Sequence, residues 1–169
     1  NGGTIYVENG HMKMNSCVDV GASAMHGSGG SIFVKGLGSH TMQATSFQHG
    51  AAKYGGFLSS MQTKIHMKEI FVNNATAYKD YHAPSSLITG GIGGALHLIK
   101  TEMTHDACTF TKITSQISGG VWMESSTLQW PTTNVDTLGL RVSTFSECTA
   151  PTGPFVTAYG KNPQVPNRL

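Results

Sequence analysis

A pair of adjacent glycines returns at nearly regular intervals along this chain of 169 residues. From one pair to the next the sequence advances 27, 26, 38 and 26 residues, the pairs of the repeat being Gly2-Gly3, Gly29-Gly30, Gly55-Gly56, Gly93-Gly94 and Gly119-Gly120. A unit of about 26 residues is too short to bury a core of its own, so such units fold only by stacking on one another. The repeat therefore predicts a single solenoid rather than several globular domains.

Apolar and mixed positions alternate directly after each glycine pair. The second position after the pair is large and apolar in every unit, and these residues form the predicted core ladder: Ile5, Ile32, Leu58, Leu96 and Trp122. A period of two is typical of a strand with one face in the core. Equivalent strands of successive units would then lie in parallel about 4.8 Å apart, with the glycines turning the chain at a corner where positive φ costs them little.

Two further features recur later in the units. The ninth residue after the pair is apolar in three of them, namely Met12, Ile65 and Met103, and the second unit is predicted to use Met42, three residues later, in the same place. A phenylalanine follows in the last four units, at Phe47, Phe71, Phe110 and Phe145. Each unit therefore has two or three short strands, and the predicted fold class is all-β, a parallel β-helix of about five coils.

Two units are longer than the repeat, which predicts two loops inserted into the coils. The segment "KDYHAPSSLITGGI" precedes the fourth glycine pair, and "SSTLQWPTTNVDTLG" lies in the last unit. Because solenoids build binding faces from such loops, Tyr81, His82 and Trp130 are the binding candidates. Residues 1–150 form the predicted β-helix, and residues 151–169, with four of the six prolines, form a predicted extended tail.

The repeated text GG-x-[IL] and F-x-x-[N/G]-x-A, with "FQHGAAKYGG" as its clearest copy, resembles a known repeat. It is similar to the right-handed parallel β-helix repeats of polymorphic outer membrane proteins and of large surface proteins of protists and bacteria. The resemblance covers residues 1 to about 150, and it departs from the family pattern at His49 and Cys148, near where the family favours Asn. It implies a right-handed β-helix with a structural or adhesive role outside the cell or on its surface.

Composition disfavours several other functions. Charged residues are 12% of the chain and the formal net charge is +2, without a Lys/Arg cluster, so nucleic acid is not an expected partner. No segment is long and apolar enough for a membrane span. The nine acids are scattered and the eight histidines form no HxH or HExxH motif, so we expect no catalytic residues, no metal site and no cofactor. Enzymatic activity is therefore not expected.

Three smaller features carry predictions of their own. The sequon Asn74-Ala75-Thr76 makes Asn74 a glycosylation candidate if the chain is secreted. Cys108 and Cys148 lie near the repeated phenylalanine on different coils, where either a disulfide or two buried thiols fits the pattern. A row of outward side chains, Tyr6, Phe33, His97 and Met123, suits sugar binding or contact with a neighbour, or is simply packed within its sheet.

Two functions of different classes remain. A solenoid exposes strand edges at its ends, and residue 1 lies so close to the first glycine pair that no cap precedes it in this sequence. This favours a non-enzymatic extracellular or cell-surface scaffold that is part of a longer protein or stacks on copies of itself into a filament. The alternative is a carbohydrate-binding or polysaccharide-cleaving module, with glycans as partners.

Overall fold

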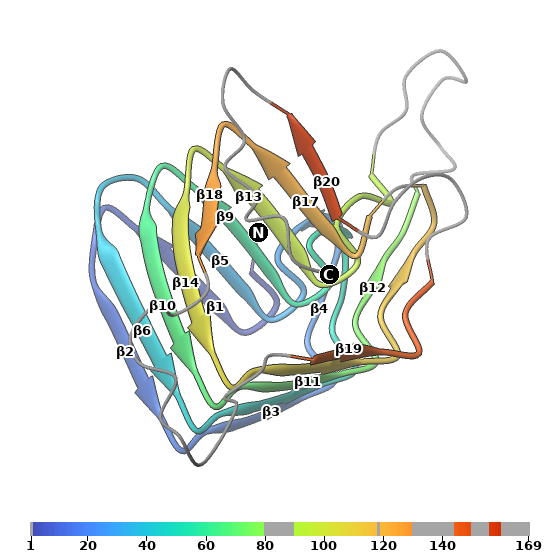
Figure 1. The fold of residues 1–169 in the computed structure, drawn as a ribbon, viewed down its shortest axis with the longest axis horizontal. Coiled ribbons are helices and arrows are strands. Elements are labelled where there is room, and N and C mark those ends of the chain that lie inside the picture. Colours follow the sequence, from blue (N-terminus) through green and yellow to red (C-terminus); the bar gives the residue numbers. More distant parts are fainter. Residues whose placement is uncertain (1, 80–89, 118, 130–143, 150–155, 160–169) are drawn as a thin grey trace, which may run out of the picture.

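The computed structural model describes residues 2–79, 90–117, 119–129, 144–149 and 156–159. These residues form a parallel β-solenoid of twenty strands, and none of them forms a helix (Figure 1). The predicted all-β fold with stacked parallel strands is confirmed. The described ranges accordingly contain no helix that could span a lipid bilayer.

Each complete coil contains four short strands. The first coil has β1 (Ile5–Glu8), β2 (Met12–Asn15), β3 (Val18–Val20) and β4 (Ser23–Ser28). The second has β5 (Ile32–Lys35), β6 (Ser39–Gln43), β7 (Ser46–Gln48) and β8 (Ala51–Tyr54). The third has β9 (Leu58–Met61), β10 (Lys64–Lys68), β11 (Phe71–Asn73) and β12 (Thr76–Ala77). The fourth has β13 (Leu96–Ile99), β14 (Glu102–Asp106), β15 (Thr109–Thr111) and β16 (Thr114–Ser115).

A fifth coil is incomplete in the part of the chain that the structure describes. It contains β17 (Val121–Glu124), β18 (Thr127–Gln129) and β19 (Thr144–Ser146), and a sixth pass begins with β20 (Val156–Tyr159). The structure therefore has four complete coils of four strands, where the sequence predicts about five coils of two or three. Because β20 pairs in parallel with β17, the solenoid continues past the predicted boundary at residue 150 into the segment predicted to be a tail.

Equivalent strands of successive coils pair to form four parallel sheets. The first sheet contains β1, β5, β9, β13, β17 and β20 in that order, and the second contains β2, β6, β10, β14 and β18. The third contains β3, β7, β11, β15 and β19, and the fourth contains β4, β8, β12 and β16. In Figure 1 these sheets are the sides of one prism around a shared interior.

The chain turns at four corners per coil, and each corner has a residue with positive φ. Three corners use single residues of many types, such as Asn9, Ala44 and Glu69 with φ between 47° and 55°. Only the corner before the first sheet uses the glycine pair. There a methyl group on Gly30 would lie 1.9 Å from the carbonyl oxygen of Gly56, so the second glycine is required by the close stacking of coils. The pair therefore marks one corner of four.

The core ladder of the first sheet has the predicted members in its first four coils. Ile5 pairs with Ile32, and the row continues through Leu58 and Leu96. The prediction of Trp122 as the fifth member is wrong, because Leu96 pairs with Val121. In the last coil the strand begins directly after the glycine pair, one residue earlier than in the others. A shift of one residue moves a side chain to the opposite face of its strand, so Val121 is fully buried and Trp122 lies on the outer side.

Two other rows also differ from the prediction. In the second sheet Ile65 pairs with His40, not with Met42, because the second coil has an extra residue at Leu37, whose side chain is 84% exposed. In the third sheet, Phe47 and Phe110 are in register with Val72. Phe71 is therefore on the outer face.

The interior between the four sheets is mostly apolar, with hydroxyl groups along one corner and the rings of His40 and His105 on the inner face of the second sheet. The core contains the aliphatic ladders of the first sheet, the methionines of the second and the phenylalanines of the third. Hydroxyl groups follow the corner between the first two sheets, where Ser60 and Thr101 lie 3.0 Å apart and the Ser126 hydroxyl accepts a bond from the Thr101 amide. These buried polar groups pair with each other, so they do not carry the cost of unpaired ones.

Candidate functional site

The outer face of the first sheet carries the most chemically varied row of side chains in the described residues. Alternation along the strands turns this row away from the buried ladder, and the register aligns Tyr6, Phe33, Ser59, His97 and Trp122. We call these five residues the outer row. Its predicted member Met123 is wrong: that side chain is 1% exposed and lies in the core.

One end of the outer row is aromatic and accessible. The ring of Tyr6 stacks on Phe33 with centroids 5.5 Å apart and planes 26° from parallel. Tyr6 is 46% exposed, whereas Phe33 beneath it in the next coil is buried. At this end of the row, the accessible aromatic surface is therefore the ring of Tyr6 in the first coil.

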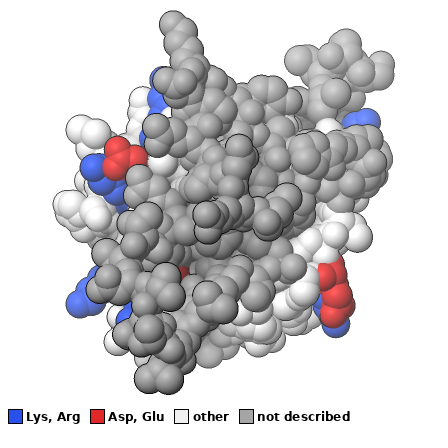
Figure 2. Space-filling view, in the orientation of Figure 1, with Lys and Arg blue, Asp and Glu red and all other residues white. Residues whose placement is uncertain are grey.

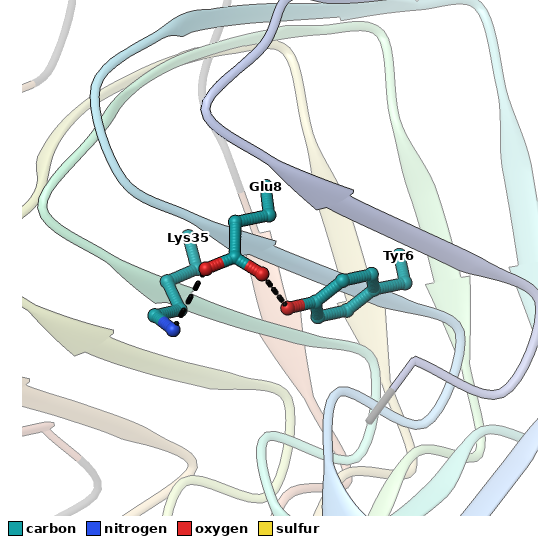
Figure 3. A network of polar contacts seen from close by, with 3 residues as sticks. All are labelled: Tyr6, Glu8 and Lys35. Carbon is teal, nitrogen blue, oxygen red and sulfur yellow. Dashed lines mark hydrogen bonds and ion pairs between the residues drawn. The ribbon is translucent and has the colours of Figure 1, made fainter.

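Charged groups surround that tyrosine. Its hydroxyl donates to a carboxylate oxygen of Glu8 at 2.5 Å, and the Lys35 ammonium donates to the other oxygen at 2.9 Å (Figure 3). The hydrogen bond to Glu8 raises the pKa of Tyr6, while the bonds from Tyr6 and Lys35 lower the pKa of Glu8. The same contact with Glu8 raises the pKa of Lys35. At neutral pH the three groups form a fixed acceptor and donor set beside an exposed ring.

The middle of the outer row is buried and contains a histidine. The hydroxyl of Ser59 lies 3.1 Å from Nδ1 of His97, and the ring of Tyr54 lies against His97 with centroids 5.1 Å apart. Burial lowers the pKa of His97 to about 4. Serine and histidine are the residue types of a nucleophile and its base. Both are at most 9% exposed, and in the described part of the chain His97 contacts Ser59 and Tyr54, neither of which is a carboxylate that could orient it.

The predicted binding residues have different outcomes. Tyr81, His82 and Trp130 lie outside the described residues. The glycosylation candidate Asn74 is exposed at the corner after the third sheet, where its side-chain amide lies 2.8 Å from Nδ1 of His49 in the preceding coil.

Some of the charged side chains on the described surface form pairs of opposite sign. Lysines contact carboxylates in three pairs, namely Lys35 with Glu8, Lys64 with Glu102, and Lys68 with Glu69. Figure 2 shows the described charged side chains of one face as small separate groups near the margin, some with blue beside red and others blue alone. Such a distribution lacks the continuous basic stripe typical of nucleic-acid interfaces.

Thiols and hard metal ligands are dispersed. None of the three cysteines forms a disulfide, with Cys108 buried and Cys17 and Cys148 half-buried, so the predicted alternative of a disulfide between Cys108 and Cys148 is wrong. Within the described ranges, no group of three or more His, Cys, Asp or Glu side chains is placed to hold a metal ion.

The first coil forms a second candidate surface. Each of its four strands, β1, β2, β3 and β4, is an edge strand of its sheet (Figure 1). Its inward side chains Ile5, Val7, Met12 and Met14 are only partly buried. Unpaired backbone groups and apolar side chains are therefore combined on this end of the solenoid.

Comparisons with protein-family models, curated proteins and solved structures find no match for this chain. The site is thus known from its own geometry. Sequence reasoning finds Tyr6, Phe33 and His97 because they share one register position. It misses Glu8, Lys35 and Tyr54, whose contacts cross between strands. The pairing of Glu8 with Lys35 could have been found from the sequence, since each stands three residues after the ladder residue of its coil.

Proposed function

We propose that this chain is a non-enzymatic structural or adhesive β-helix protein of the cell surface or the extracellular space. It acts by stacking its first coil on another parallel coil, which belongs either to a second copy of the chain or to a longer protein of which the chain is a segment. The observation that carries the proposal is the first coil, where four strand edges and a partly exposed apolar interior face the same direction.

The energetic argument starts from the difference between the first and second coils. Ile32, Val34 and Met42 are fully buried between two coils, whereas their partners in the first coil have a coil on one side only. Another coil would bury those side chains and pair the backbone of all four edges. A contact between unlike ends of identical chains does not close on itself, so it produces filaments rather than dimers.

The experiment is a measurement of association against concentration by sedimentation velocity and light scattering. We expect wild-type chains to associate and Met14→Lys, which puts a charge on the inner face of β2, to remain monomeric. Asn15→Lys is the matched control, because it adds the same charge to the outer face of the same strand and should associate like the wild type. Ile5→Glu provides a second inner-face variant, and circular dichroism checks the fold of all three.

Two results would contradict self-stacking. One is a wild-type chain that stays monomeric at the highest soluble concentration. The other is association that Met14→Lys and Ile5→Glu leave unchanged although both are folded.

A second candidate is glycan binding through the outer row, favoured by the exposed ring of Tyr6 beside Glu8 and Lys35. Aromatic faces with adjacent hydrogen-bonding groups suit sugar rings. A glycan array should then show ligands that Tyr6→Ala no longer binds, while Met25→Ala, which truncates an exposed side chain on β4, still binds them. An empty array for the wild type removes this candidate, and a polysaccharide lyase and hydrolase assay tests the absence of catalysis.

A further inference from the structure

The inner face of the second sheet is unusually rich in sulfur and imidazole. One inward row contains Met12, His40, Ile65, Met103 and Leu128, and the other contains Met14, Met42, Met67 and His105. Methionine alone would be ordinary flexible core filling. Histidine in the same rows is not, because a buried imidazole needs a partner for its polar atoms.

His40 lacks such a partner. Its side chain is 1% exposed, and both ring nitrogens are buried without a hydrogen bond. An unpaired buried polar group destabilises the folded chain, and this ring has two polar atoms. Native proteins seldom leave such atoms unpaired, and a bound water or ion is a common reason when they do.

Thioether side chains surround His40 on the inner face. Met12 is its direct partner in the neighbouring strand, and Met42 follows two residues later on the same face of β6. Met14 is the direct partner of Met42. Paired Cα atoms lie about 4.8 Å apart and alternate residues of a strand about 7 Å apart, so the four long side chains start from neighbouring positions on the inner face of the first two coils.

The donor set has a definite preference. Thioether sulfur is a soft ligand that selects Cu(I), and imidazole nitrogen also binds copper. Neither a thioether nor a neutral imidazole has to lose a proton to bind the ion. The four residues include no carboxylate or backbone oxygen that would prefer a hard cation such as Ca²⁺ or Mg²⁺.

The position also provides a route for the ion. Met12 and Met14 belong to the first coil and are half-buried, whereas His40 and Met42 in the second coil are almost completely buried. The thioethers therefore extend from the exposed end of the solenoid to the unpartnered ring inside it.

We propose that Met12, Met14, Met42 and His40 form a binding site for one Cu(I) ion inside the first two coils. Binding replaces the missing partner of the imidazole with a metal–nitrogen bond and involves no change in the oxidation state of the ion. The site is independent of the stacking proposed above, since its ligands all come from one chain.

The test is an anaerobic titration of the full chain with Cu(I) in competition with a chromophoric Cu(I) chelator. Because free thiols bind Cu(I) strongly, it uses the background Cys17→Ser, Cys108→Ala and Cys148→Ser. We expect one equivalent of Cu(I) to bind, with X-ray absorption showing sulfur and nitrogen ligands. His40→Leu and Met42→Leu should each weaken binding at least about tenfold.

Met103→Leu and Met123→Leu are the matched controls, because each removes a buried sulfur of a later coil that pairs with none of the four proposed ligands. Both should bind Cu(I) as the background does. If His40→Leu fails to fold, Met42→Leu and Met12→Leu decide the result, since leucine and methionine have similar volume.

Three results overturn the proposal. The first is no Cu(I) uptake by the folded background chain, which would leave water as the partner of His40. The second is uptake only when the cysteines are present. The third is uptake that the variants at His40, Met42 and Met12 do not change.

Discussion

Acid should destabilise this solenoid well above the pH at which carboxylates titrate, because it contains buried histidines, among them His97 and His105. His97 is 9% exposed and His105 is 2% exposed. Burial lowers the pKa of each to about 4, from an ordinary value of 6.5. Between these values the unfolded chain binds protons that the folded chain does not. The stability is therefore complete above pH 6.5 and is lost as the pH falls toward 4.

The magnitude follows from the two pKa values. At about 1.4 kcal/mol per pH unit, the interval from 6.5 to about 4 corresponds to about 3 kcal/mol for each histidine. The part of this interval above pH 5 accounts for about 2 kcal/mol each. Two such losses are a large fraction of the about 5 to 15 kcal/mol by which domains are stable.

The assay is urea unfolding between pH 7.5 and pH 5, followed by circular dichroism. The variant His97→Gln keeps a hydrogen-bonding group beside Ser59 and removes the titration. His105→Met continues a row that already contains methionines. The double variant should lose about 4 kcal/mol less than the wild type over this range.

His26→Gln is the control, because it changes a histidine on an exposed part of β4. It should have the pH dependence of the wild type. If the double variant and the wild type lose stability in parallel, the imidazoles accept protons inside the folded solenoid and the reasoning from burial is refuted.

Three further predictions concern the repeat and its surface. Gly30→Ala should prevent folding or lower the free energy of unfolding by more than about 4 kcal/mol, because its methyl group meets a carbonyl of the next coil. Gly21→Ala, with φ of 75° and open space around it, should lower it by about 1 kcal/mol. Urea unfolding measures both, and equal losses would contradict the stacking argument. Val72→Ala should cost about 2 kcal/mol and exceed Phe71→Ala, because Val72 is 1% exposed and Phe71 is 39% exposed; the reverse order in thermal unfolding would mean that the register of β11 is wrong. Secretion from eukaryotic cells should add an endoglycosidase-sensitive mass that Asn74→Gln removes, and an unmodified wild-type chain by mass spectrometry would reject that site.

The glycine pairs made the architecture predictable because they combine two requirements at one place. The first glycine of a pair needs positive φ, and the second has no room for a Cβ atom against the next coil. The other three corners need only one residue with positive φ, which Asn9, Ala44 or Glu69 supplies as well. Those corners have no compositional signal, which is why four strands per coil were not predicted.

Two errors in the predicted rows come from a one-residue change in the length of a coil, whereas Phe71 stands one residue before the inward position of its strand. An extra residue at Leu37 moves His40 into the row where Met42 was predicted, and a missing residue after the last glycine pair replaces Trp122 by Val121. Because strands alternate with a period of two, one residue decides between core and surface. Counting residues from the glycine pair therefore predicts the inward positions of a strand only where the number of residues between the pair and that strand is the same in every coil.

The candidate site was predictable only in part, for the same reason. Tyr6 and Phe33 share a register position that the repeat defines, so their stacking follows from the alignment of the units. The contact of Tyr54 with His97 joins the end of one coil's last strand to the first sheet of a later coil. Such a contact depends on the corner geometry, which the repeat period alone does not specify.

The added residue at Leu37 has a practical consequence for protein engineering. The strands before and after it keep their partners, since Lys35 pairs with Met61 and Ser39 with Lys64. The turn thus accommodates an extra residue without changing the register of the strands on either side of it. A short peptide grafted there would be displayed to solvent on a rigid frame.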